Sequence, residues 1–149
     1  MKNKIVFSVL FLVTGLVVGN NLYSKIDPSV LSTFKESNEF FLLQEGIYND
    51  KESMQNQTRD INPKVYEIKD DKYYVYVGIT SNKDIAEKLK EIYKKNNIDV
   101  YIKNIKIKDK DFINNLNQFD ILIESTNNPN EVLTIEEVVL SGFNNKILG

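Results

Sequence analysis

Residues 65–78, with the sequence VYEIKDDKYYVYVG, decide the fold class of this chain. Two segments, Val65-Tyr66-Glu67-Ile68 and Tyr73-Tyr74-Val75-Tyr76-Val77-Gly78, are rich in β-branched and aromatic residues, which favour strands. Asp70-Asp71 lies between them and predicts a tight reversal. We therefore expect the two segments to be neighbouring antiparallel strands.

A similar pattern continues on both sides of this pair. Upstream, residues 40–48 are rich in strand-forming residues and end at Asn49-Asp50, and the polar segment 50–60 predicts a short helix capped by one of these two residues. Downstream, Ser81 and Asp84 approximate a capping box before a helix that ends at Asn96-Asn97. Residues 100–107 predict the last strand of the sheet.

The resulting order over residues 40–108 is β-α-β-β-α-β, which predicts an α+β fold. We expect a four-stranded antiparallel sheet with two helices on one face. The other face of the sheet should stay free, and a free sheet face is a natural binding surface.

Residues 109–149 form a C-terminal helical extension in this interpretation. Apolar residues recur at helical spacing in two runs separated by a break at 127–130, namely Phe112, Leu116, Phe119 and Ile123, then Ile135, Val138, Val139 and Phe143. Two amphipathic helices that pack back onto the domain are one interpretation. Docking on a protein partner is the other, and a helix pair across the free sheet face would cover it.

Residues 1–25 predict a membrane anchor or a signal segment. Lys2 and Lys4 precede an apolar run from Ile5 to Gly19. We interpret residues 5–23 as an uncleaved anchor in the cell membrane, since Val17-Val18-Gly19 is a poor cleavage site; the alternative is secretion after signal cleavage. Both interpretations leave the chain beyond the linker at 26–39 outside the cytoplasm.

The composition excludes several classes of function. The 149 residues include no Cys and no His, so disulfides, Cys-based zinc sites and histidine bases are absent. The net charge of −2 and the single arginine, Arg59, disfavour nucleic-acid binding. No residues stand out as catalytic, cofactor-binding or metal-binding, and we do not expect an enzyme.

Several segments, taken in order, resemble the SPOR (sporulation-related repeat) domain family. Leu43-Gln44-Glu45-Gly46-Ile47-Tyr48 resembles its first-strand pattern, and Tyr74-Val75-Tyr76-Val77-Gly78 resembles its second signature. The segment 84–93 is similar to its second helix, and Asn97-Ile98-Asp99-Val100-Tyr101-Ile102 is similar to the approach to its last strand. The resemblance covers residues 40–108 and implies a domain that binds peptidoglycan, favouring glycan strands stripped of stem peptides, in cell division or sporulation.

Three positions depart from the family pattern. Tyr74 stands where the family usually has Arg, Glu45 where an apolar residue is usual, and Ile79 where Pro is common. Glu45 would have to reach solvent or a lysine, because an unpaired buried carboxylate is costly.

The candidate ligand-binding residues are Gln44, Tyr74, Tyr76, Lys72 and Ile102. Side chains alternate along strands, so Gln44, Tyr74 and Tyr76 should share the free face, with Lys72 at its edge and Ile102 opposite on the last strand. The resemblance implies binding roles for Gln44, Tyr74 and Ile102. The competing interpretation is that these residues serve only strand packing.

Two functions from different classes remain open. The first is a membrane-anchored extracytoplasmic protein that binds peptidoglycan glycan strands. The second is an extracytoplasmic protein-interaction module that keeps the fold and has lost glycan binding. RNA binding shares the β-α-β-β-α-β order with sheet aromatics, but the N-terminal segment and the acidic balance argue against it.

Overall fold

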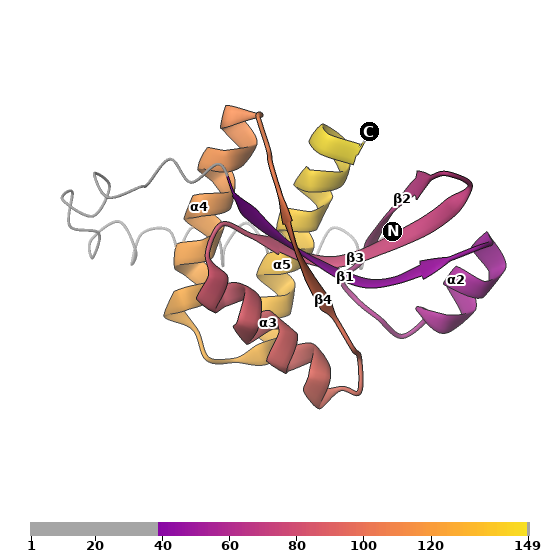
Figure 1. Ribbon diagram of the computed structural model, residues 1–149. Coiled ribbons are helices and arrows are strands. Elements are labelled where there is room, and N and C mark those ends of the chain that lie inside the picture. Colours follow the sequence, from indigo (N-terminus) through magenta and orange to yellow (C-terminus); the bar gives the residue numbers. More distant parts are fainter. Residues whose placement is uncertain (1–38, 149) are drawn as a thin grey trace, which may run out of the picture. The chain divides into compact units, whose positions relative to one another are not determined.

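The structure, a computed structural model, describes residues 39–148 (Figure 1). The predicted anchor at residues 1–25 and residues 26–38 of the predicted linker lie outside the described residues. None of the helices within residues 39–148 is long and apolar enough to cross a membrane. The described residues 39–148 belong to one compact unit, so residues 109–148 fold together with the predicted segment 40–108.

The protein is an α+β fold with a four-stranded antiparallel sheet. The predicted β-α-β-β-α-β order is confirmed, and two longer helices and a final π-helical turn, η2, follow it. The elements are β1 (Phe40–Tyr48), α2 (Lys51–Gln57), β2 (Val65–Lys69), β3 (Lys72–Thr80), α3 (Lys83–Lys95), β4 (Tyr101–Ile105), α4 (Lys110–Ser125), α5 (Pro129–Phe143) and η2 (Asn144–Leu148).

The strand order in the sheet is β2-β3-β1-β4, so β1 and β3 are its central strands. The predicted reversal at Asp70-Asp71 is confirmed: both residues have positive φ, 52° and 57°, and they join β2 to β3 through the pair Lys69 and Lys72. The register between β1 and β3 shifts on either side of Gln44, which leaves Val77 and Glu45 as bulged residues.

Local side chains fix the ends of α2 and α3. Asp50 caps α2 as predicted, because its Oδ1 accepts a hydrogen bond from the Ser53 N–H at 2.8 Å. The prediction that Ser81 caps α3 in a capping box is wrong. Asn82 is the cap, because its Oδ1 accepts a hydrogen bond from the Asp84 N–H at 2.8 Å. Asn97, with φ of 59°, follows the end of α3 in the left-handed conformation expected there.

One face of the sheet, which we call the α3 face, packs against α2 and α3. Leu43 of β1 and Val75 and Val77 of β3 share a buried cluster with Met54 of α2 and with the apolar side of α3. The α3 members of the cluster are Ile85, Ala86, Leu89, Ile92 and Tyr93. The prediction of two helices on one face is thus confirmed by their shared core.

The opposite face, which we call the α5 face, is largely covered. The prediction that it stays free is wrong, because α4 and α5 pack on it, and α5 passes behind the sheet in Figure 1. The cluster there joins strand residues to helix residues: Phe40, Leu42, Tyr76 and Ile79 of the sheet, and Phe112, Leu116, Val139, Leu140 and Phe143 of the helices. The C-terminal segment is therefore part of the domain core.

Phe143 offers a direct test of this cover. Its side chain is 1% exposed, and its ring meets the Tyr76 ring nearly edge-on, with centroids 6.4 Å apart. We expect Phe143→Ala to lower the free energy of unfolding by about 3–5 kcal/mol, since it leaves a cavity under the sheet. Val138→Ala, at a 38%-exposed position of the same helix, should change it by less than about 0.5 kcal/mol. Urea unfolding of residues 37–149 followed by circular dichroism measures both, and equal effects would contradict the packing.

Candidate functional site

Two of the predicted ligand-binding residues are buried under the C-terminal segment. Gln44 and Tyr76 are cross-strand partners on the α5 face, as their parity predicts, but they are only 5% and 6% exposed. The Tyr76 hydroxyl donates a hydrogen bond to Glu67 Oε2 at 3.0 Å. The Gln44 Oε1 atom is buried with no hydrogen-bond partner among the described residues. Neither side chain is open to a polymer in this structure.

The outer part of the α5 face stays accessible, and we call it the open strip. Its members are Ile47, Lys72, Tyr74, Tyr101 and Lys103. Tyr101 is 66% exposed and Ile47 is 48% exposed, while Tyr74 is half-buried. Predicted residues Tyr74 and Lys72 therefore lie on an accessible part of the predicted face.

Lys103 and Tyr74 meet across the central strand β1. Lys103 comes from β4 on one side of β1, Tyr74 comes from β3 on the other, and the Lys103 Nζ lies 5.7 Å from the centre of the Tyr74 ring. A cation at this distance from an aromatic face is attracted to it, with about 0.5–1 kcal/mol at exposed sites. Sequence reasoning missed Lys103, because it placed the neighbouring residue, Ile102, on this face.

Ile102 lies on the other side of the sheet from the remaining candidates. It pairs with Leu43, and it packs against the cluster of the α3 face. The prediction that it shares the binding face is wrong. Its neighbours Tyr101 and Lys103 alternate with it, so they are the β4 residues on the α5 face.

A buried carboxylate joins α5 to the central strand β3. Glu136 is 0% exposed, and its Oε1 accepts a hydrogen bond from the Ile79 N–H at 2.6 Å. A Cβ at Gly78 would lie 3.4 Å from the same oxygen, which is close contact. The pKa of the Glu136 carboxyl is raised well above its usual value, chiefly because burial disfavours the charged form.

A second buried carboxylate joins α4 to the end of β3. Asp120 is 5% exposed and accepts hydrogen bonds from the Thr80 hydroxyl at 2.6 Å, the Ser81 N–H at 2.8 Å and the Ser81 hydroxyl at 2.6 Å. Burial raises its pKa, and the bonds from Ser81 and Thr80 oppose that rise. Both carboxylates hold the C-terminal helices on the sheet and are closed to a substrate.

The sequence carries signals for these features. The four consecutive apolar residues of Phe40-Phe41-Leu42-Leu43 put large side chains on both faces, which is typical of a strand buried on both sides. Glu136 lies at helical spacing from Val132, Val139 and Leu140, all of them buried. Its burial is the surprise, because an acidic residue on a helix is most often a solvated one.

The side chains of the open strip are of kinds that bind ligands by stacking and by charge. The open strip supplies two tyrosines, two lysines and one isoleucine, which suit stacking and charge pairing. Within residues 39–148, no group of three or more acidic side chains is placed to hold a metal ion.

Comparison with known proteins finds no family model, curated protein or solved structure that matches the chain.

Substituting Glu136 tests the effect of its raised pKa on stability. The Glu136 carboxyl has a higher pKa in the folded chain than in the unfolded chain. As pH rises from about 4 through the folded pKa, the unfolded chain therefore loses this proton first. The free energy of unfolding of the wild type falls over that range. Glu136→Gln keeps an acceptor for the Ile79 N–H and removes this titration. We therefore expect the variant to become progressively more stable than the wild type as pH rises from 5 to 8.

Thermal melts of residues 37–149 across this pH range measure the difference. Glu137→Gln, at the exposed neighbouring position, is the matched control and should follow the wild-type curve. A Glu136→Gln curve that runs parallel to the wild type at every pH would contradict the assignment.

Proposed function

We propose that this protein binds peptidoglycan glycan strands through the open strip, on the outer side of the cell membrane, in cell division or sporulation. The resemblance of residues 40–108 to SPOR domains motivates the ligand class. The observation that carries the proposal is the pairing of Lys103 with Tyr74 beside the exposed Tyr101.

Lys103 supports the proposal because it brings a cation to the position where the resemblance leads us to expect one. SPOR domains usually carry Arg where this chain has Tyr74, and here the Lys103 ammonium lies over the Tyr74 ring. Removal of a stem peptide by amide hydrolysis leaves a free carboxylate on the sugar. Lys103 and Lys72 can pair with such carboxylates, although single exposed ion pairs are weak.

The tyrosines of the open strip would supply the contact area. A sugar ring presents C–H groups that pack on an aromatic face, and its hydroxyl and amide groups bond at the edges. Tyr101 is the more exposed of the two tyrosines of the open strip, with 66% of its surface accessible. Gln44 and Tyr76 lie beside the strip on the same face, and they do not contact the ligand in this proposal.

The burial of Gln44 and Tyr76 favours a second candidate function. A domain whose central sheet residues are covered by its own helices has a smaller surface for a polymer than an open sheet has. An extracytoplasmic protein-interaction module that has lost glycan binding fits this cover. Binding to purified cell walls separates the two functions.

The test is co-sedimentation of the full-length protein, in mild detergent, with intact and amidase-treated sacculi. We expect stronger binding to the amidase-treated material, which weakens as salt is added because charge pairing contributes. Tyr101→Ala should weaken that binding by about tenfold and Lys103→Ala by roughly three- to fivefold.

Lys94→Ala removes an exposed lysine from α3 and is the charge-matched control; it should bind as the wild type does. A wild-type protein that stays in the supernatant with both kinds of sacculus would favour the protein-interaction module. Binding that all three variants retain would move the glycan site away from the open strip.

A further inference from the structure

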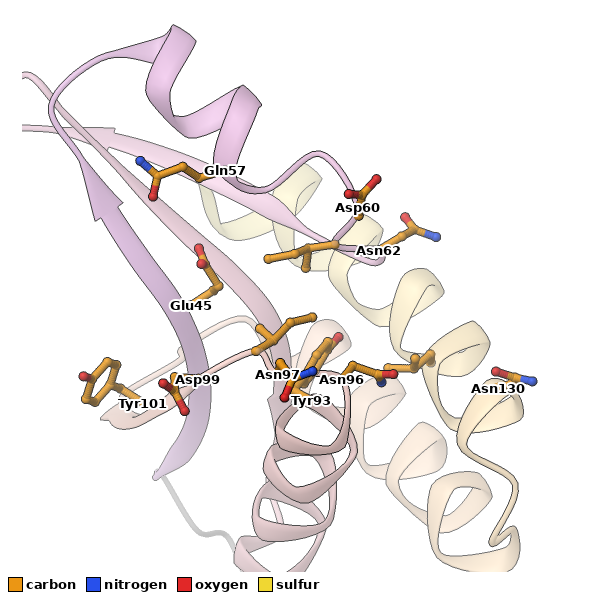
Figure 2. A pocket seen from close by; sticks show the side chains of 13 residues that line it. Glu45, Gln57, Asp60, Asn62, Tyr93, Asn96, Asn97, Asp99, Tyr101 and Asn130 are labelled. Atoms are coloured by element: carbon orange, nitrogen blue, oxygen red, sulfur yellow. The ribbon is translucent and has the colours of Figure 1, made fainter.

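A polar groove opens between α2, the loop from α3 to β4, and the start of α5 (Figure 2). Its volume is about 740 Å³, enough for a short peptide segment or a small ligand. The groove borders the open strip at Tyr101, which lines both, whereas Lys72, Tyr74 and Lys103 do not line the groove. Its lining includes carboxylate and amide side chains from Glu45, Gln57, Asp60, Asn62, Asp99 and Asn130.

The lining carries negative charge and no positive charge. Glu45, Asp60 and Asp99 are its ionisable carboxylates, and no lysine or arginine lines the groove. Asp60 and Asp99 are exposed to water. A cationic ligand matches this lining, whereas a carboxylate-bearing glycan does not.

Glu45 occupies the groove because of the bulge in β1. The register between β1 and β3 skips this residue, and Figure 2 shows its carboxylate pointing into the space below Gln57. The Tyr48 hydroxyl, 2.8 Å away, donates to it. Partial burial is the main cause that raises the pKa of Glu45, and the charge of Lys64 opposes it. Lys64 itself donates to the carbonyls of Thr58 and Ile61, at 2.6 and 2.9 Å.

Side-chain amides also line the groove. Gln57, Asn62 and Asn130 are exposed and each offers one acceptor and two donor hydrogens. These groups complement the N–H and C=O groups of a peptide backbone. Asn96 contributes less, because its side chain already donates to the Ile92 carbonyl at 3.0 Å.

We infer that this groove binds a peptide segment that carries a primary ammonium group, such as a lysine side chain. The carboxylates receive the ammonium and the amides receive the flanking peptide groups. The site goes beyond the proposed glycan function, since its carboxylates and amides are not members of the open strip and it takes a ligand of opposite charge. A free diamine shares the ammonium but lacks the peptide groups, so it distinguishes the two sources of a cation.

The experiment is titration of the ¹⁵N-labelled full-length protein in detergent micelles with the blocked tripeptide acetyl-Gly-Lys-Gly-amide. We expect saturable shifts of backbone amide signals confined to the residues that line the groove and their neighbours, at Glu45, residues 57–62, residues 96–101 and Asn130. The same tripeptide with norleucine in place of lysine should bind at least about tenfold more weakly, since it keeps the stem and loses the charge. The diamine 1,5-diaminopentane should also bind more weakly than the lysine tripeptide.

Two double variants complete the test. Asp60→Asn with Asp99→Asn should weaken lysine-tripeptide binding by about tenfold, because two groove charges are lost. Asp84→Asn with Glu91→Gln neutralises two exposed acidic residues of α3 that do not line the groove, and it should bind as the wild type does. Equal weakening in both variants, or equal affinity for the norleucine tripeptide, would overturn the site.

A diamine that binds as tightly as the lysine tripeptide would overturn the peptide part of the inference. Lys103→Ala, the variant of the open strip, should leave the tripeptide titration unchanged. Loss of sacculus binding with an intact tripeptide titration, or the reverse, therefore separates the two sites.

Discussion

The hydrogen bond from the Ile79 N–H to the Glu136 carboxylate is the interaction on which the rest of the arrangement depends. It is buried, and it joins α5 to β3 beside Gly78, where a Cβ would lie 3.4 Å from the Glu136 oxygen. A buried carboxyl is costly unless its oxygens are hydrogen-bonded, and one oxygen of Glu136 has no partner among the described residues. This contact therefore specifies where α5 lies at some expense in stability.

The position of α5 divides the α5 face of the sheet into two parts. Phe143, at the end of α5, packs edge-on against Tyr76, and the residues around this pair form the second core. What remains accessible lies toward the β2–β3 turn and along β4, where Tyr74, Lys103 and Tyr101 gather. The helices that stabilise the sheet thus also set the outline of the surface proposed to bind glycan.

Local sequence signals predicted the elements well and their packing less well. The turn at Asp70-Asp71, the cap of α2 at Asp50 and the two helices α4 and α5 were all predicted correctly. Each of these features depends on residues that are close together in the chain. The burial of Gln44 depends on where a distant helix docks, and helix amphipathicity does not encode that position. The bulge at Glu45 shifts the alternation within β1, so strand parity alone did not place this residue.

The strand order has a further consequence for how copies of this protein behave when they are crowded together. In the described part of the chain, β2 and β4 are the outermost strands, and lysines accompany both: Lys64 and Lys69 at the ends of β2, and Lys103 and Lys106 within and after β4. Outer strands can recruit further strands from other molecules, and lysines along them oppose this by charge repulsion. Neighbouring molecules should therefore resist edge-to-edge joining of their sheets into fibres.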